Sequence, residues 1–270
     1  MLVLIRRGSA LAIRSPAKVN LFLEVLRRRP DGYHELSTVM HAVSLFDTLT
    51  FRRAGEDRLS LGRGSLPVPV DGTNTIWKAV AEMRRRLGMR GGLQVSLIKR
   101  IPSGAGLGGG SGNAAAAILA CDRLFRLKLT GAEMADIGAA VGSDVPFFFG
   151  GGSALCGGRG ERICVIPHFP AIHLVLLVPA VRKSTAEVYN NLEREDLTGR
   201  RKNVKLRLNR MEKTASGGAM ANAVSSLLWN RLESPALRLF PGLMGIKERM
   251  ARAFPLGASM TGSGTAFFGL

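Results

Sequence analysis

The chain opens with short apolar runs separated by polar joints, and two of these runs alternate as half-buried strands do. Val19–Val25 and Ser37–Phe46 are therefore predicted strands. Between them, the sequence Arg-Pro-Asp-Gly at Arg29–Gly32 predicts a turn, because proline fixes φ and glycine accepts a positive φ.

Apolar residues then recur with the period of a helix in Asn74–Leu87, where Asn74 can cap the start and Gly88 can end it. One face of this helix is expected to carry Ile76, Val80, Met83 and Leu87. Further helices are predicted at Ala114–Phe125, Gly131–Val141, Ala219–Leu232 and Leu243–Ala253. Further strands are predicted at Gly92–Ile101, at Ile172–Pro179 and among the turns of Gly150–Gly160. A Gly-Ser-Gly turn is expected between two apolar segments in Ala258–Gly269.

The length of 270 residues suits two small domains, and a change of composition indicates a boundary near residues 160–170. Hydrophobic residues make up 46% and charged residues 21%, which is typical of a globular protein. No segment approaches the roughly 20 apolar residues that span a bilayer, and the N-terminal residues do not have the pattern of a secretory signal. The three cysteines form no Cys-x-x-Cys pair, which favours a reduced cytoplasmic protein without a disulfide framework.

The formal net charge of +18 would attract polyanions such as nucleic acid, anionic membranes or phosphorylated metabolites. The basic residues are spread in short clusters, however, and they are not interleaved with aromatic residues as in single-strand binders. A solvated basic surface and an attraction for phosphorylated molecules both stay open. The polar and basic stretch Leu192–Ser216 is expected to form a loop or a lid-like helix, and its use is not predicted.

Six glycines crowd the segment between the strand predicted to end at Ile101 and the helix predicted to begin at Ala114. Glycine permits backbone conformations that a Cβ forbids, and it lets backbone N–H groups approach a ligand. Ser111 or Asn113 can cap the following helix, whose N-terminus attracts anions through its unpaired donors and its dipole. The candidate phosphate loop comprises Pro102, Ser103, Gly104, Ala105, Gly106, Leu107, Gly108, Gly109, Gly110, Ser111 and Gly112.

Three interpretations of this loop compete. A purely structural turn would carry the entropic cost of ordering six glycines. A dinucleotide site matches the spacing of Gly104, Gly106 and Gly109, but it needs an acidic residue after a second strand, whereas Asp122 lies within a predicted helix. A cradle for a nucleoside triphosphate would have to differ from the common P-loop, because no Gly-Lys-Ser/Thr sequence is present.

Two charged residues adjoin strongly apolar segments. Lys18 begins an apolar strand, from which its ammonium group can point into a cleft or out to solvent. Asp144 lies between a helix end and an apolar run, where an unpaired carboxylate would be costly, so a lysine or helix N–H groups should partner it. Near an acceptor hydroxyl, Asp144 could act as a general base; alternatively it is a turn or capping residue.

Three segments, in this order, resemble the motifs of the GHMP kinase superfamily. Ser15–Asn20 resembles its first motif, Pro102–Asn113 its Pro-x-x-x-Gly-Leu-Gly phosphate loop and Gly257–Thr265 its glycine-rich third motif. The resemblance spans nearly the whole chain. It implies an α+β fold of two domains, here an ATP-binding domain of residues 1–163 and a second domain of residues 164–270, with the active site in the cleft between them.

Asp31-Gly-Tyr-His34 and Gly142-Ser-Asp-Val-Pro146 are similar to one branch of this superfamily. That branch phosphorylates the 2-hydroxyl of 4-diphosphocytidyl-2-C-methyl-D-erythritol in non-mevalonate isoprenoid synthesis. The resemblance implies a cytoplasmic phosphotransferase with an alcohol acceptor that uses ATP and Mg²⁺, with Lys18 and Asp144 as the catalytic pair. The ligands of Mg²⁺ are not identified, although Ser111 is a candidate. The implied substrate-binding residues are Asn20, Tyr33, His34, Thr185 and Tyr189, of which Tyr33, His34 and Tyr189 match cytidine-binding positions.

The chain departs from the pattern of this branch at several positions. Gly112 stands where a second serine is usual, Arg231 where an aspartate is usual, and Thr261 where serine is common. The chain also ends at Leu270, whereas members of the branch usually continue through another segment.

Two rival functions stay open at this point. One is another kinase of the superfamily, acting on homoserine or phosphomevalonate. The other is nucleic-acid binding, motivated by the net charge, which should weaken steeply as the salt concentration rises. The resemblance implies a CDP-linked small molecule as the partner, with neither a membrane nor a nucleic acid, and it leaves the number of subunits unpredicted.

Overall fold

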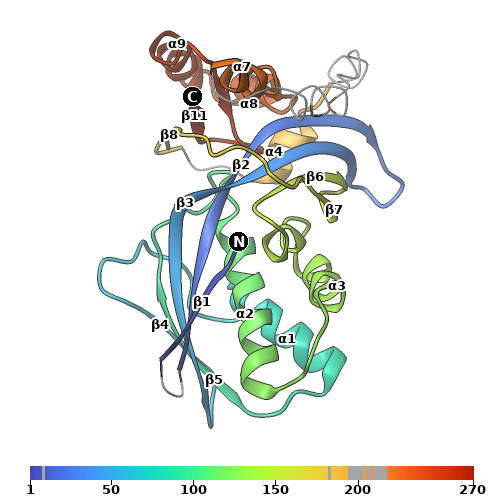
Figure 1. The fold of residues 1–270 in the computed structure, drawn as a ribbon, viewed down its shortest axis with the longest axis vertical. Helices are drawn as coiled ribbons and strands as arrows, with labels where there is room; N and C mark the ends of the chain where they lie inside the picture. The colour runs from blue at the N-terminus through green and yellow to red at the C-terminus, as the bar shows by residue number, and fades with distance from the viewer. Residues whose placement is uncertain (8–9, 182–183, 194–203, 205–207, 209–217) are drawn as a thin grey trace.

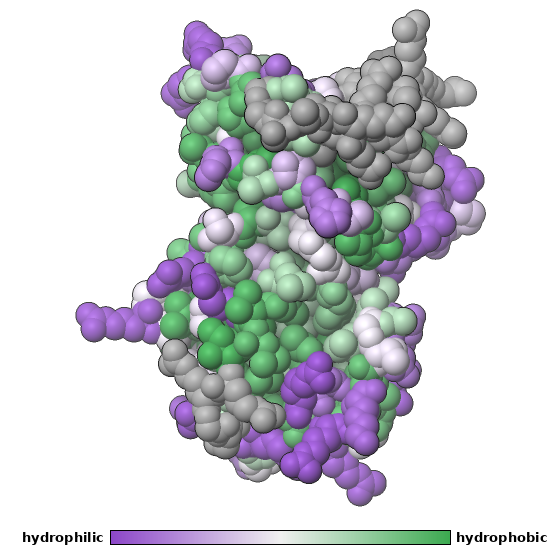
Figure 2. All heavy atoms as spheres, in the orientation of Figure 1, coloured by the Kyte–Doolittle hydropathy of each residue, from purple (hydrophilic) through white to green (hydrophobic). Residues whose placement is uncertain are grey.

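The computed structural model describes residues 1–7, 10–181, 184–193, 204, 208 and 218–270. It mixes helices and strands, which confirms the predicted α+β class. The ribbon forms a lower and an upper lobe, and the C-terminus lies in the upper one (Figure 1). In the space-filling view, hydrophobic residues extend across the middle of the lower lobe and hydrophilic residues gather around its lower rim (Figure 2).

The strands of the described residues form two sheets. The larger sheet contains β1 (Val3–Arg7), β2 (Ala10–Arg28), β3 (His34–Ala54), β4 (Arg58–Leu61), β5 (Gly92–Ile98), β6 (Ser153–Gly158), β7 (Arg162–Val165) and β9 (Trp229–Asn230). The smaller sheet contains β8 (Val175–Leu177), β10 (Ala258–Met260) and β11 (Phe267–Gly269). The main path through the larger sheet is β1-β2-β3-β5-β4, while β6 also pairs with β3, β7 with β6 and β9 with β2.

Strands β2 and β3 form a long antiparallel hairpin around the predicted turn, where Gly32 has a φ of 82°. Both strands extend beyond their predicted ranges. The full length of β2 could not be predicted from the pattern of hydrophobic and polar residues, because most of the strand is buried on both faces and lacks polar alternation. Bulges near Pro16 and Asn20 shift its register against β3. The hairpin runs through both lobes (Figure 1), and Lys18 lies midway along β2.

The helices of the lower lobe are α1 (Thr75–Leu87), α2 (Gly109–Phe125) and α3 (Gly131–Val141), which pack against one another (Figure 1). As predicted, Asn74 caps α1, and Gly88 ends it in the left-handed conformation with a φ of 62°. The prediction that Leu87 belongs to the buried face is wrong, because residues 85–87 of the last turn are all exposed. The buried face consists of Ile76, Ala79, Val80 and Met83.

The C-terminal part contains α7 (Gly218–Ser225), α8 (Glu233–Leu239) and α9 (Leu243–Ala253), and the bounds of α9 match their prediction. The predicted helix Ala219–Leu232 is too long. It ends at Ser225, because Trp229 and Asn230 pair in parallel with Phe22 and Leu23 of β2. This pairing places a C-terminal segment on the N-terminal sheet, which no local pattern signals.

Several shorter segments differ from their predictions. The strand β5 ends at Ile98 instead of Ile101, because the backbone N–H groups of Arg100 and Ile101 donate to Asp47 Oδ1 and not to a neighbouring strand. The region around β6 contains a second strand, β7, and the short helices Pro146–Phe149 and α4 (Thr185–Asn190) were not predicted. Most of the basic stretch between residues 194 and 217 lies outside the described residues. The predicted boundary after residue 163 falls within β7 and stays a prediction.

The three cysteines are free, and Cys121 and Cys156 are buried. Burial raises the pKa of both buried thiols to about 12, so they stay protonated and unreactive at neutral pH. Within the described part of the chain, no helix has the length and apolar character needed to cross a membrane.

Candidate active site

The phosphate loop enters α2 without any side-chain cap. The helix begins at Gly109, five residues before its predicted start, and its N-cap residue Gly108 has a φ of 70°. The prediction that Ser111 or Asn113 caps the helix is therefore wrong, because both residues lie inside its first turns. A helix start without a side-chain acceptor leaves its backbone donors available to an anion in the cavity that Gly108 and Gly109 line.

Backbone hydrogen bonds fix the loop to the two other predicted motifs. The N–H of Lys18 donates to the carbonyl of Leu107 at 2.9 Å, and the N–H of Ala266 donates to the carbonyl of Ala105 at 3.2 Å. The approach is so close that a Cβ at Gly106 would overlap the carbonyl oxygen of Thr261. Glycine is thus required where the loop passes between β2 and the third motif.

Lys18 and Asp144 meet inside the cavity, although they come from distant parts of the chain. Their Nζ and Oδ2 atoms are 3.3 Å apart, with the lysine side chain 4% exposed and the aspartate side chain 29% exposed. Lys18 comes from the middle of β2, and Asp144 lies between α3 and the short helix Pro146–Phe149. The ammonium group is therefore partnered in the interior, while one side of the carboxylate stays open to a ligand.

Asn20 orders this pair. Its Oδ1 accepts a hydrogen bond from Lys18 Nζ at 2.7 Å, and its Nδ2 donates to Thr38 Oγ1 at 2.8 Å. The backbone N–H of Asn20 donates to Thr261 Oγ1 at 3.0 Å, so the departure from serine at position 261 keeps the hydroxyl in use. Because hydrogen bonds hold both the Oδ1 and the Nδ2 atoms of Asn20, the Asn20 side chain is fixed and in turn fixes the orientation of the Lys18 ammonium group.

The cavity that contains the pair has a volume of about 770 Å³, which suits a ligand of nucleotide size. Of the predicted site residues, only Ala105 and Gly112 do not line it; Gly112 faces Ser15 and Phe148 instead. The predicted residues that line the cavity are Lys18, Asn20, Tyr33, His34, Pro102, Ser103, Gly104, Gly106, Leu107, Gly108, Gly109, Gly110, Ser111, Asp144, Thr185 and Tyr189.

At one end of the cavity, the rings of His34 and Tyr189 stack on each other, with centroids 5.2 Å apart and planes at 30°. A flat base can enter between them only when the rings separate. Burial, assisted by the positive charge of Arg28, lowers the pKa of His34, so its ring is neutral at pH 7. Burial also raises the pKa of the Tyr189 phenol. Thr185, at the start of α4, accepts a hydrogen bond from Ser263 Oγ at 3.2 Å.

The other end of the cavity contains a buried ion pair that sequence reasoning missed. Lys99 Nζ lies 2.7 Å from Asp47 Oδ2, and Lys99 also donates to the carbonyl of Ile101, directly before the phosphate loop. Burial lowers the pKa of Lys99, although Asp47 opposes this effect. Lys99 lies in a predicted strand and Asp47 directly follows another one. A charged residue in such a position is expected to face solvent, so the pair becomes evident only from the contact in the folded structure.

Comparison with known proteins places this geometry in a family. A family model described as the GHMP kinases N terminal domain matches residues 74–152. A 4-diphosphocytidyl-2-C-methyl-D-erythritol kinase from Pelobacter propionicus is 40% identical over 261 residues, which cover 97% of this chain and 89% of the relative. A kinase of the same name from Geobacillus kaustophilus is 40% identical, with coverage of 96% and 88%.

Solved structures agree with these sequence relatives. A crystal structure of 4-(cytidine 5'-diphospho)-2C-methyl-D-erythritol kinase aligns with a TM-score of 0.74 and 36% identity, covering 96% of this chain and 89% of that one. A homoserine kinase from Cytophaga hutchinsonii aligns with a TM-score of 0.67 over 99% and 87% of the two chains. Its identity of 18% supports a shared fold alone.

A glycine-rich loop that enters an uncapped helix beside a buried Lys–Asp pair, in this α+β fold, defines a small-molecule kinase of the GHMP class. Within that class, the identity over almost the whole chain is specific to one branch. The chain belongs to the 4-diphosphocytidyl-2-C-methyl-D-erythritol kinase family.

Proposed function

We propose that this protein transfers the γ-phosphoryl group of ATP to the 2-hydroxyl of 4-diphosphocytidyl-2-C-methyl-D-erythritol in isoprenoid precursor synthesis. The products are the 2-phosphate and ADP. The observation that carries the proposal is the Lys18–Asp144 ion pair, which lies in a single cavity with the phosphate loop and with the stacked rings of His34 and Tyr189. Membership of the family supports the choice of substrate.

Asp144 acts on the acceptor hydroxyl. Its carboxylate is partly exposed to the cavity, so it can accept a hydrogen bond from the 2-hydroxyl and take the proton as the new bond forms. Bound ATP supplies the phosphoryl group. The bond between this phosphoryl group and the departing ADP breaks as the bond between the phosphoryl group and the alcohol oxygen forms. The same carboxylate orients the hydroxyl towards the phosphate loop.

Lys18 supplies a fixed positive charge next to the reacting atoms. Its ammonium group contacts Asp144 and is oriented by Asn20, so no reorganisation is needed when negative charge moves towards the transferred group. Asn20 is a positioning residue in this scheme, because it acts through Lys18.

The site fits the triphosphate of ATP. The glycine-rich loop lines the cavity, and the uncapped start of α2 directs backbone donors towards it. Val68 and Pro69 line the cavity and offer an apolar surface for the adenine. Thr75 Oγ1 donates to the carbonyl of Gly110 at 2.8 Å and holds the loop against α1.

Mg²⁺ would be held mainly by phosphate oxygens. The described residues contain no group of three or more His, Cys, Asp or Glu side chains that could hold a metal ion by themselves. Mg²⁺ commonly keeps several waters and binds through substrate phosphates with few protein ligands. The hydroxyl of Ser111, which lines the cavity in the first turn of α2, is the candidate protein ligand.

At the substrate end, His34 and Tyr189 would separate and enclose the cytosine between their rings, since aromatic faces favour offset stacking. Thr185 and Tyr33 line the same end.

The proposal also includes the division into a domain of residues 1–163 and a domain of residues 164–270, a cytoplasmic location and no nucleic-acid partner. In this proposal, the +18 charge attracts phosphorylated metabolites.

The test is release of ADP from ATP and Mg²⁺, with and without the CDP-linked substrate. We expect substrate-dependent release for the wild type and a loss of at least about 100-fold in Asp144→Asn, which removes the general base. Binding of ATP to Asp144→Asn should be retained, because the phosphate loop is intact.

Asp136→Asn is the matched control, since Asp136 lies on α3 with its side chain 74% exposed and away from the cavity. Full turnover in Asp144→Asn would remove this residue from the mechanism. Folded wild-type protein that releases ADP with homoserine or phosphomevalonate, and none with the CDP-linked alcohol, would reject the proposed substrate.

A further inference from the structure

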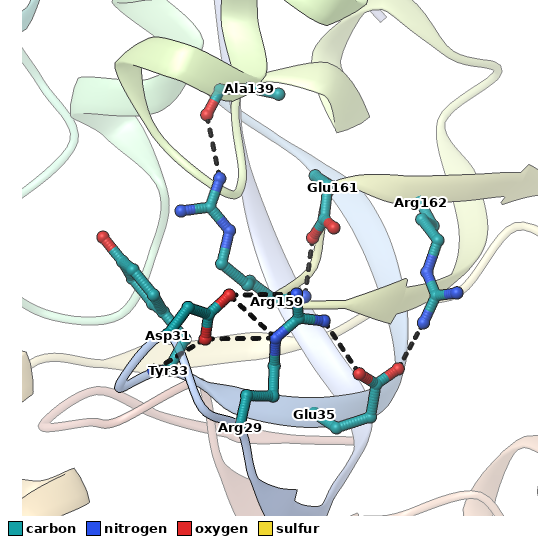
Figure 3. Close-up of polar contacts among 8 residues, drawn as sticks. All are labelled: Arg29, Asp31, Tyr33, Glu35, Ala139, Arg159, Glu161 and Arg162. Atoms are coloured by element: carbon teal, nitrogen blue, oxygen red, sulfur yellow. Dashed lines mark hydrogen bonds and ion pairs between the residues drawn. The ribbon is translucent and has the colours of Figure 1, made fainter.

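The arginine side chains of this protein differ in how their charge is balanced. Arg29 and Arg162, for example, share the carboxylate of Glu35 (Figure 3). Arg14 is exposed on β2 and takes part in none of the ion pairs found among the described residues. Its guanidinium carbon lies 4.1 Å from the centre of the Phe46 ring. A cation that rests on a ring face without a carboxylate keeps its N–H donors available to an anion.

Phe46 is also part of the wall of a second cavity, which has a volume of about 630 Å³. This second cavity lies between the middle of the β2–β3 hairpin, residues 151–153 at the start of β6, and residues 165–171 at the end of β7 and beyond it. Its wall is largely apolar and includes Pro16, Val43, Phe46, Ile166 and Phe169. A cavity of this volume suits a small organic molecule.

The polar side chains inside the second cavity satisfy one another. His41 Nδ1 lies 2.7 Å from Ser153 Oγ, and the His41 ring packs against Phe169 with centroids 5.1 Å apart. Burial lowers the pKa of His41 to about 4, so this ring is neutral at pH 7. The described residues that line the cavity include no aspartate or glutamate. Nothing in this lining therefore repels an anion, and Arg14 stands beside it as a cation.

The second cavity is separate from the candidate active site. None of the described residues lines both cavities. Met40 lines the main cavity and His41 lines the second one, because successive residues of a strand point to opposite faces of the sheet. A molecule in the second cavity would therefore leave room for ATP and for the acceptor alcohol.

We propose that the second cavity binds a small molecule with an apolar chain and one anionic group. The chain lies against Phe46 and Phe169, and the anionic group meets the guanidinium of Arg14. This group is a carboxylate or a phosphate monoester, because the planar fork of arginine matches two oxygens of either one.

Both parts of such a ligand are needed. An inorganic anion would leave the apolar wall exposed to water, whereas a neutral alcohol with the same chain would leave the guanidinium without a partner. The two interactions differ in kind, since burial of the chain depends on its apolar area and the contact with Arg14 depends on charge. Each can therefore be varied while the other is kept.

The test measures binding to the full chain by calorimetry at physiological ionic strength, with octanoate and octyl phosphate as probes. We expect one molecule of either probe per chain. From butyrate to octanoate, the affinity should rise by roughly 10-fold for each pair of added methylene groups. The tighter of the two probes identifies the preferred anionic group.

Arg14→Gln tests the contact with the anion. The affinity for octanoate should fall by roughly 10-fold, as expected for the loss of a hydrogen bond to a charged group, while the affinity for octan-1-ol is unchanged. Arg52→Gln is the matched control, because Arg52 is exposed on the neighbouring strand β3 and does not line the cavity. Its affinity for octanoate should equal that of the wild type.

Ser44→Glu is a second test that leaves Arg14 in place. Ser44 lines the cavity and is exposed, so its replacement should not disturb the core. A carboxylate at this position should repel octanoate and weaken its binding, whereas Ser44→Gln should retain it. Thermal melting of each variant separates a lost contact from a lost fold.

Four outcomes would overturn the inference. Equal affinities for butyrate and octanoate would mean that an anion binds without its chain, and equal affinities for octanoate and octan-1-ol would mean that the charge is not recognised. Displacement of the probe by ADP or CDP would place it in the main cavity. Equal losses in Arg14→Gln and Arg52→Gln would indicate a general attraction to the +18 charge.

The inference and the proposed function can fail separately. The binding experiments need neither ATP nor turnover, so their result stands whether or not the wild type releases ADP with the CDP-linked substrate. Substrate-dependent ADP release without binding of octanoate or octyl phosphate would refute the second site and leave the function standing.

Discussion

The resemblance noted in the sequence implies an aspartate at the position of Arg231, and the surroundings of Arg231 predict that an aspartate would destabilise this chain. Arg231 Nε lies 2.6 Å from Glu24 Oε1, and Nη2 lies 3.1 Å from Oε2. Trp229 Nε1 also donates to Oε2 at 3.1 Å. The Glu24 side chain is 3% exposed and that of Arg231 is 14% exposed, so this pair joins β2 to the segment after β9 in the interior.

The magnitude follows from the burial of Glu24. Removing one partner of a buried ion pair costs about 3–5 kcal/mol, because the other charge stays buried without compensation. Trp229 still donates to Glu24 and Arg231 is not wholly buried, so Arg231→Ala should lie near the lower limit, at about 3 kcal/mol. Arg231→Asp should cost more, since it places a second carboxylate beside the first. In a chain of this length, about 3 kcal/mol corresponds to a fall in Tm of roughly 6–12 °C.

The assay is urea unfolding of the wild type, Arg231→Ala, Arg231→Asp and the double variant Glu24→Gln/Arg231→Asp. The double variant should recover much of the loss, because it removes the buried like-charge contact. Arg249→Asp on the exposed face of α9 controls for the change of net charge and should leave the midpoint close to that of the wild type. If Arg231→Asp had the same urea midpoint of unfolding as the wild type, the reasoning would be refuted.

Two further predictions concern buried or partly buried residues away from the reacting atoms. In Gly112→Ala, the new Cβ would overlap Ser15 Oγ and lie 3.1 Å from a Phe148 ring carbon, so overpacking should cost about 1–3 kcal/mol in urea unfolding. The cost should fall in a Ser15→Ala background, and an equal cost in both backgrounds would contradict the contact. Burial, with a smaller effect of the N-terminal amino group, lowers the pKa of His41 to about 4. The unfolded state then takes up the proton first as the pH falls, so stability is complete above pH 6.5 and should decrease by about 2 kcal/mol at pH 5; equal pH slopes for the wild type and His41→Asn would reject this linkage.

Local patterns predicted the elements whose boundaries depend on neighbouring residues. The helices α1, α3 and α9 match their predictions. Helical periodicity and a glycine that ends a helix are both local signals, which depend only on residues a few positions apart. The same reasoning failed for the helix predicted to continue to Leu232, since Trp229 and Asn230 take strand geometry from β2. It also placed the start of α2 too late, because glycines with low helix propensity form its first turn.

The candidate site divides in the same way. The phosphate loop, Lys18 and Asp144 could be singled out from the sequence, because glycine clusters and charges beside apolar runs are costly unless they have a use. Lys99 and its partner Asp47 could not, since nothing in their local sequence distinguishes them from solvated charged residues.

The sequence by itself determined the class of chemistry, the α+β character and the residues available for catalysis. Only the tertiary structure decided which other charges meet: Lys99 with Asp47, and Glu24 with Arg231, which are 207 positions apart. The physical reason is that the interaction of two charges depends on their separation and on the solvent around them, and both are set by folding. A residue's type limits what it can do, and its partner across the fold selects what it does.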